Sequence, residues 1–246
     1  MKVCILEVGK LPYLLEHRFG NYTSMFSNLF EQLNIKIDLE TFEITKFHYP
    51  TNPKAADLWL ITGSSFGVYE DLAWIGQLKK FIKQIIVKKI GLIGICFGHQ
   101  IIAEAMGGEV QKSEKGWGVG VQQYERFCEP AWTQKVGPNF SGYTSHQDQV
   151  TIAPSCSYTV YGSNFCPHAV LAYGSKEKPI AISIQSHPEF SDDLLRELIK
   201  RRIGKTIPRP IGEKALKSLK KAPENLRNAN LPPKRVICEG IANVIV

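Results

Sequence analysis

The chain has 246 residues, of which 43% are hydrophobic and 22% are charged. This is the composition of an ordinary globular protein, and it excludes a disordered chain, a disulfide-stapled mini-protein and a membrane protein. Thirty Lys and Arg residues against 23 Asp and Glu residues give a net charge of +7, which permits an acidic partner without proving one.

The six cysteines are scattered and form no CxxC pair, so neither a disulfide framework nor a zinc site is indicated. We expect a reducing, cytoplasmic location and no metal or cofactor. Glu7 interrupts the first apolar residues too early for a secretory signal, whose apolar region needs about 7 to 15 residues. The longest stretch poor in charge, 90–108, carries His99, Glu104 and several glycines, so we expect no membrane contact.

In the first half of the chain, short apolar runs alternate with helical spacing. We predict strands at 3–8, 35–42, 58–61 and 91–95, and helices at 22–33, 74–85 and 98–106. Asn21 is the expected N-cap of the first of these helices. This order predicts an α/β fold in which a doubly wound, mostly parallel sheet carries helices on both faces and binds ligands at the carboxyl ends of its strands.

The second half is different, because 109–185 is rich in Gly, Pro, Tyr and β-branched residues. This β-rich segment predicts partly antiparallel strands, for example at 119–124, 169–173 and 180–185. A helix at 192–202 follows, with Ser191 or Asp192 as its cap, then a further helix at 211–219, a Pro-rich link and an apolar end. Without repeats or a clear linker, 1–246 is expected to be a single domain.

The strongest local signal is the sequence G-I-C-F-G at 94–98, between a predicted buried strand and a predicted helix. Glycines on both sides of Cys96 match a nucleophile elbow, which holds the central side chain at the carboxyl edge of the sheet. The start of a helix also stabilises a thiolate. The alternative is that Cys96 is a small buried hydrophobic residue.

A thiol nucleophile needs a base, and the base needs a group that orients it. His187 and Glu189, in the sequence S-H-P-E at 186–189, follow the strand predicted at 180–185 and so fall on the same sheet edge as Cys96. A carboxylate two residues from an imidazole can fix its tautomer and favour its protonated form.

Together, G-I-C-F-G-H-Q at 94–100 and S-H-P-E at 186–189 resemble class I, triad-type glutamine amidotransferase domains, especially the GMP-synthase-like branch. The resemblance is strongest over 3–202, which leaves 203–246 as a C-terminal helical extension and tail. It implies a flavodoxin-like fold in which Cys96 is the nucleophile, His187 the general base and acid, and Glu189 the third triad member. It further implies an oxyanion hole from the backbone of Gly63 and Phe97. The residues implied to hold the substrate are Gln100, Ser145, His146 and Gln147.

The implied reaction is hydrolysis of the γ-glutamyl amide bond of glutamine through a γ-glutamyl thioester, with release of ammonia for a separate synthetase partner. The sequence leaves two alternatives open. One is a stand-alone γ-glutamyl peptidase or hydrolase acting on a peptide or amine conjugate. The other is a catalytically silent binding or regulatory subunit, against which the intact Cys96, His187 and Glu189 argue.

Other features of the sequence favour no second activity. Gly204-Lys205-Thr206 resembles the end of a P-loop, but Ile199 replaces the first glycine of that motif. The basic run 200–221 is interpreted as a solvated face, with docking to an acidic protein or RNA as the alternative. Because aromatic and basic residues do not alternate as in RNA-binding folds, we do not expect nucleic acid to be a partner.

Overall fold

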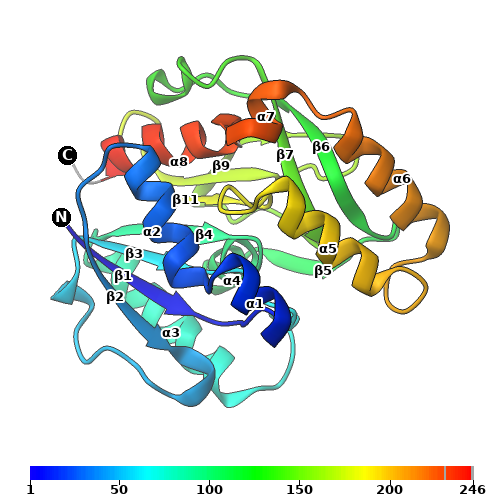
Figure 1. The fold of residues 1–246 in the computed structure, drawn as a ribbon. Coiled ribbons are helices and arrows are strands. Elements are labelled where there is room, and N and C mark those ends of the chain that lie inside the picture. Colours follow the sequence, from blue (N-terminus) through cyan, green and yellow to red (C-terminus); the bar gives the residue numbers. More distant parts are fainter. Residues whose placement is uncertain (230, 245–246) are drawn as a thin grey trace.

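A computed structural model describes residues 1–229 and 231–244 of the chain (Figure 1). The strands are β1 (Lys2–Glu7), β2 (Asp38–Glu43), β3 (Leu58–Ile61), β4 (Gly91–Ile95), β5 (Glu109–Lys112), β6 (Gly118–Arg126), β7 (Asn139–His146), β8 (Asp148–Ile152), β9 (Ser157–Gly162), β10 (Val170–Gly174) and β11 (Pro179–Ile184). The helices are α1 (Tyr13–Phe19), α2 (Tyr22–Gln32), α3 (Ala73–Val87), α4 (Phe97–Ala105), α5 (Asp192–Arg202), α6 (Arg209–Lys220), α7 (Glu224–Ala229) and α8 (Leu231–Val244).

A nine-stranded sheet in the order β2-β1-β3-β4-β11-β10-β9-β6-β7 organises the molecule. The first five strands of this order run parallel, and the pairs from β11 to β7 are antiparallel. Strands β5 and β8 form a separate antiparallel pair. The predicted α/β class, with a parallel part followed by a β-rich part, is therefore confirmed.

Side chains alternate along the central strands and so divide the core into two layers, as expected for a sheet covered on both faces. In β1, Ile5 faces a cluster that includes residues of α2, α5, α6 and α8, whereas Leu6 faces a cluster that includes residues of α3 and α4. In Figure 1, α2, α5 and α8 accordingly lie in front of the sheet and α4 lies behind it.

Local signals set the helix ends. The side chain of Asn21 accepts a hydrogen bond from Ser24 N, and that of Ser191 accepts one from Leu194 N, so both are N-caps. The strand expected at 35–42 begins only at Asp38. The reason lies at the end of α2, where Asn34 is left-handed (φ 56°) and Ile35 N donates to Phe30 O. This turn ends the helix, and it takes up the first residues that the sequence assigned to the strand.

The C-terminal part differs most from expectation. The Pro-rich link and apolar end expected after 219 are instead helices α7 and α8, and α8 contacts β11, β7 and β4. Prolines at 232 and 233 fall in the first turn of α8, where a missing N–H removes no helical hydrogen bond. Helix α1, at the other end of the chain, was not predicted either.

Among the helices that the structure describes, none is both long and apolar enough to span a bilayer.

Candidate active site

Strand register brings three sequence segments to one edge of the sheet. Ile61 of β3 pairs with Gly94 of β4, and Ile184 of β11 pairs with Ile95. Because these strands are parallel, the residues that follow them leave the sheet on the same side. Gly63, Cys96 and His187 are those residues, so strand order alone brings the predicted nucleophile, base and backbone donor together.

The turn at Cys96 has the strained backbone of an elbow. Cys96 has φ 52° and ψ −100°, a conformation that a non-glycine residue seldom adopts. A Cβ at Gly94 would lie 2.5 Å from Gly98 O, and one at Gly98 would lie 2.4 Å from Ile61 O. Both glycines are therefore required for helix α4 to begin directly at the end of β4.

His187 is held on two sides. Its Nδ1 donates to Glu189 Oε1 at 2.7 Å, and its ring stacks on Phe190 with centroids 3.9 Å apart and planes 7° apart. The His187 and Glu189 side chains are almost completely buried, with 4% and 0% exposed. With Nδ1 committed to the carboxylate, Nε2 is the nitrogen left for the Cys96 side chain.

Electrostatics in this group favour an imidazolium ion. Burial lowers the pKa of His187, but the Glu189 charge, the Cys96 charge and hydrogen bonds to both outweigh burial and raise that pKa to about 10. A buried cation is stable only beside compensating charge. The arrangement therefore supports a proton on His187 next to the Cys96 sulfur.

The two predicted oxyanion donors lie beside Cys96. A Cβ added at Gly63 would lie 3.7 Å from Cys96 Cβ and 2.9 Å from His187 Cε1, so the Gly63 backbone closely approaches both. Phe97 N belongs to the first turn of α4, where backbone N–H groups have no partner within the helix. Tyr22 also borders the site, and burial, with the nearby Glu189 and Cys96, raises the pKa of its hydroxyl.

Cys96 and His187 open into a cleft of about 930 Å³. One wall comes from the loop after β3, including Ser64 and Phe66, and the opposite wall comes from the turn between β7 and β8. The predicted substrate residues Gln100, Ser145, His146 and Gln147 all line this cleft. The backbone ties the two halves together, because His187 N donates to Tyr143 O of β7 at 2.8 Å.

Three of these predicted substrate residues, Gln100, Ser145 and His146, already have protein partners. Gln100 Nε2 donates to Asp148 O at 2.8 Å and to Gln185 Oε1 at 3.1 Å, so its amide hydrogens connect α4 to the wall at the start of β8 and to the residue that follows β11. His146 Nδ1 donates to Asp148 O at 3.1 Å, and burial lowers the pKa of His146 to about 4. His146 is therefore neutral at pH 7, unlike His187.

Sequence reasoning missed Arg202, which it assigned to the solvated basic run. The Arg202 side chain lines the cleft, and its Nη1 donates to Ser145 Oγ at 2.9 Å. A signal was present in the sequence, because Arg202 lies four residues after Leu198, on the buried side of α5. Tyr69 was also missed, and its hydroxyl crosses the cleft to donate to Asp148 Oδ2 at 3.2 Å.

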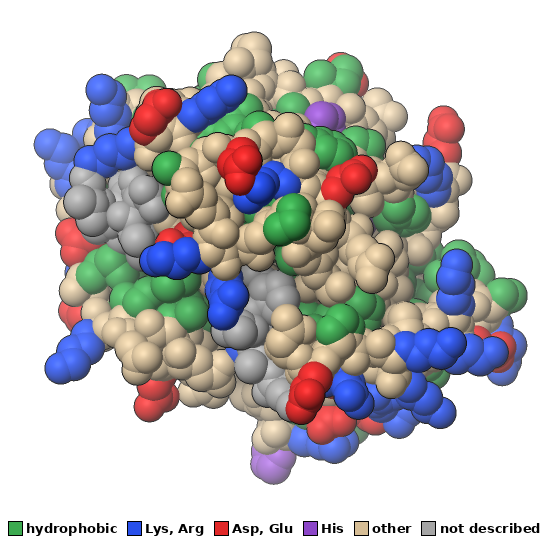
Figure 2. Space-filling view, turned by 90° about the horizontal axis from the view of Figure 1, so that it is seen from above, with side chains coloured by type: hydrophobic (Ala, Val, Ile, Leu, Met, Phe, Trp, Pro, Cys, Tyr) green, Lys and Arg blue, Asp and Glu red, His purple; other side chains and the backbone are tan. Residues whose placement is uncertain are grey.

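The rest of the basic run faces solvent, as the sequence predicts. Its exposed members are Lys200, Arg201, Lys205, Arg209, Lys214, Lys217, Lys220 and Lys221. Seen from above in Figure 2, Lys and Arg side chains gather along the lower right edge of the molecule, the side on which Figure 1 draws α6.

Comparison with known proteins connects this geometry to a family. The profile of the family described as "Glutamine amidotransferase class-I" matches residues 19–203. A putative glutamine amidotransferase-like protein of Schizosaccharomyces pombe is 28% identical, over 80% of this chain and 83% of its own. Gamma-glutamyl peptidase 4 of Arabidopsis thaliana is also 28% identical, over 74% of this chain and 73% of its own.

Two further matches differ in how much of the chain they cover. A glutamine-hydrolyzing GMP synthase subunit of Methanococcus vannielii is 32% identical, but over only 48% of this chain and 60% of its own. The crystal structure of a glutamine amidotransferase from Methylobacillus flagellatus superposes with a TM-score of 0.78, covering 98% of this chain and 94% of that one, at 18% identity. At that identity the match shows a shared fold.

Proposed function

Since the chain belongs to the class I glutamine amidotransferase family, we propose that it hydrolyses γ-glutamyl amide bonds with Cys96 as nucleophile, His187 as general base and acid, and Glu189 as the third triad member. The observation that carries this proposal is the coupling of His187 to both Glu189 and Cys96 beside a wide cleft. Amidohydrolase activity also agrees with the gamma-glutamyl peptidases among the relatives.

Acylation begins when the Cys96 thiolate attacks the γ-carbonyl carbon and the carbonyl electron pair moves to oxygen. The backbone N–H groups of Gly63 and Phe97 donate to that oxyanion. When the intermediate collapses, the C–N bond breaks and the leaving amine takes the proton from His187 Nε2. A γ-glutamyl thioester remains on Cys96.

Acylation of Cys96 itself favours proton transfer from His187 to the leaving amine. A neutral thioester lacks the negative charge with which Cys96 raises the pKa of His187. The imidazolium therefore becomes a stronger acid at the step in which the amine needs a proton. Neutral His187 can then take a proton from water, which attacks the thioester, releases the γ-carboxylate and restores the thiolate.

Charges at the cleft provide for the α-substituents of the substrate. We propose that Arg202, with Ser145, binds the α-carboxylate, because a guanidinium suits a planar anion. We propose that Asp148, with His146 and Gln147 beside it, borders the α-ammonium group. Gln100 acts by fixing this wall to α4.

Glutamine is the simplest substrate, and its ammonia could pass to a synthetase partner, as the resemblance to a GMP synthase component implies. The cleft favours a second candidate. About 930 Å³ lies near the upper end of the roughly 300–1,000 Å³ usual for ligand pockets, so it has room beyond a carboxamide. A γ-glutamyl peptide or amine conjugate uses that room for its leaving group.

One experiment tests the proposal and ranks the substrates. The protein is treated with a glutamine-mimicking electrophile, located by mass spectrometry, and then assayed for amine release on glutamine and a panel of γ-glutamyl peptides and amides. We expect an adduct on Cys96 and turnover of at least one panel member. An unmodified Cys96 and no turnover would favour a silent binding protein, and turnover of glutamine only with an added partner would identify an ammonia-transfer component.

A further inference from the structure

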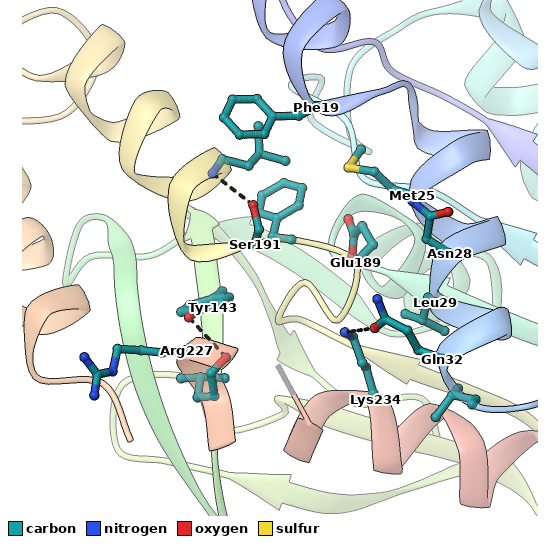
Figure 3. Close-up of a pocket in the computed structure, with 14 residues that line it drawn as sticks. Phe19, Met25, Asn28, Leu29, Gln32, Tyr143, Glu189, Ser191, Arg227 and Lys234 are labelled. Carbon is teal, nitrogen blue, oxygen red and sulfur yellow. Dashed lines mark hydrogen bonds between the residues drawn. The ribbon is translucent and has the colours of Figure 1, made fainter. Parts of the chain in front are cut away.

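The acidic side chain that a substrate's α-ammonium group can meet is narrowed to one residue. Among the described residues, Glu70 and Asp148 are the carboxylates that line the catalytic cleft. Glu70 Oε1 accepts from Gly67 N at 2.5 Å, so Glu70 is engaged within its own loop. Glu189 borders a separate cavity of about 490 Å³ (Figure 3), but its side chain is 0% exposed and bonded to His187, so no ligand reaches it. Asp148 remains, half-buried at the start of β8.

The backbone of Asp148 is fixed in the cleft wall. Its carbonyl oxygen accepts from Gln100 Nε2 at 2.8 Å and from His146 Nδ1 at 3.1 Å. Gln100 lies in the first turn of α4, and its backbone N–H donates to Cys96 O at 3.1 Å. The residue that carries the carboxylate is therefore tied to the helix that starts directly after the proposed nucleophile.

The Asp148 side chain, in contrast, is held from the opposite wall. The hydroxyl of Tyr69 crosses the cleft and donates to Asp148 Oδ2 at 3.2 Å. Asp148 Oδ1 has no hydrogen bond within the described part of the chain and is not a buried atom, so it is open to a ligand in the cleft. Lys112, the cross-strand neighbour of Asp148 in β5, is exposed.

The loop that carries Tyr69 is built to aim it. Glu70 N donates to Gly67 O at 3.1 Å, which closes a tight turn with Val68 and Tyr69 at its centre. Val68 is completely buried and anchors this turn to the core. The Tyr69 ring folds over Gly67, because a Cβ there would lie only 2.8 Å from Tyr69 Cζ. The hydroxyl therefore reaches Asp148 from a constrained turn.

The same hydrogen bond affects the charge of Asp148. Burial raises the pKa of this carboxyl, and the hydrogen bond from Tyr69 and the charge of Lys112 oppose that rise. The charge of Glu70 adds to it, and His146, on the other side, is neutral at pH 7. A donor that binds the ionised form favours ionisation. Removal of the Tyr69 hydroxyl should therefore keep Asp148 protonated up to a higher pH.

Building on the proposed γ-glutamyl hydrolysis, we propose that Tyr69 is a positioning residue that makes the protein selective for γ-glutamyl compounds. Tyr69 holds Asp148 through Oδ2, so that Oδ1 accepts from the α-ammonium group of the substrate. Amides of glutarate lack only this ammonium group and gain nothing from the contact. Because Tyr69 takes no part in bond breaking, its loss should raise KM and leave kcat nearly unchanged.

Binding of two amides tests this role apart from catalysis. γ-Glutamyl ethylamide and glutaryl ethylamide are titrated by calorimetry into the full chain carrying Cys96→Ala, with and without Tyr69→Phe. The Phe substitution should weaken binding of the γ-glutamyl compound about tenfold, because a hydrogen bond to a charged group is lost, and leave the glutaryl compound unchanged. A merely structural role would weaken both alike. An unchanged ratio of the two affinities, or no binding of either compound, would overturn the proposal.

Matched variants and pH locate the effect. Tyr13→Phe removes a hydroxyl from a side chain that is 81% exposed, and it should leave both affinities unchanged. In an Asp148→Asn background, Tyr69→Phe should no longer change the ratio, since the two residues act as a pair. The ratio should also fall on acidification, and this fall should begin at higher pH in Tyr69→Phe. A full Tyr69 effect in the Asn background, or the same pH dependence in both proteins, would contradict the proposal.

Catalysis separates this inference from the proposed function. With Cys96 intact, release of ethylamine from γ-glutamyl ethylamide should show an about tenfold higher KM in Tyr69→Phe at a similar kcat. Absence of ethylamine release from the wild type would count against the hydrolysis, whereas the affinity ratio would still decide the role of Tyr69. A loss confined to kcat would refute positioning by Tyr69 and leave the hydrolysis intact.

Discussion

The parallel and antiparallel parts of the sheet contribute differently to the candidate active site. The parallel strands β3, β4 and β11 lead into Gly63, Cys96 and His187, so the proposed chemistry rests on neighbouring strands of one sheet. The antiparallel part contributes Ser145, near the end of β7, which accepts a hydrogen bond from Arg202 of α5. The neighbouring Asp148 begins β8 of the separate β5–β8 pair. The proposed catalytic residues and the proposed residues for the α-substituents of the substrate therefore lie on different parts of the fold, and we expect that they can be changed separately.

Among substitutions at the ends of the parallel strands, Cys96→Ala should cause the largest loss of activity. It removes the proposed nucleophile, so we expect amine release from γ-glutamyl substrates to fall by at least on the order of 10⁴-fold. Binding of substrate should persist, because the opposite wall is unchanged. Amine release and substrate binding by calorimetry are measured on the same preparation, and activity above one tenth of wild type would contradict the assignment.

A smaller change on the parallel side is Gly63→Ala. The new Cβ would meet His187 Cε1 at 2.9 Å, so the imidazole must move, and displacements of this size cost on the order of 10²-fold in rate. Gly76→Ala is the control, since a Cβ there meets nothing within 4 Å and should stabilise α3 by up to about 1 kcal/mol. Steady-state rates and thermal melting of both variants check this, and equal rates would refute the close approach.

On the antiparallel side, Arg202→Met should mainly raise KM. Losing a charge-assisted contact to a carboxylate costs about 1.5–3 kcal/mol, which corresponds to about a 10- to 100-fold change in kcat/KM. The neighbouring Arg201→Met removes an equal charge from an exposed position and should behave as wild type. If the two variants show the same kinetics, then Arg202 acts only through general charge.

The mildest effect concerns pH. Because folding raises the pKa of His187 to about 10, its contribution to stability is complete below its unfolded pKa of about 6.5 and is lost as pH rises through about 10. Cys96→Ala removes two of the raising causes, so the contribution should be smaller and its loss should be complete at a lower pH. Urea unfolding midpoints between about pH 6 and 10 measure this, and identical pH profiles of the two proteins would argue against the His187–Cys96 coupling.

Much of the parallel half could be predicted from sequence because its signals are local. Leu58–Ile61 and Gly91–Ile95 are short apolar runs, and both are strands with those bounds. Their parallel pairing follows from helix α3 between them, and the parallel pairing of β4 with β11 brings Cys96 and His187 to one edge. The family resemblance added Gly63, whose approach to the imidazole no local pattern indicates.

The other features depend on contacts between distant segments, which a single sequence does not reveal. Arg202 is one basic residue among many until β7 brings Ser145 to it. Tyr69 meets Asp148 across 79 positions of the chain. Helix α8 contains prolines that read as a link, and its packing on β11, β7 and β4 is what makes it part of the core. The sequence thus predicted the strands that carry the candidate site better than the side-chain contacts across the cleft.

The central place of β11 has a consequence for how the chain is made. This strand lies between β4 and β10, yet it is synthesised after both of them. While Pro179–Ile184 is still inside the ribosome, the nascent parallel layer ends at β4 with unsatisfied backbone groups. We therefore expect a translational pause before residue 179 to leave an aggregation-prone intermediate, and a pause after β11 has emerged to be less harmful.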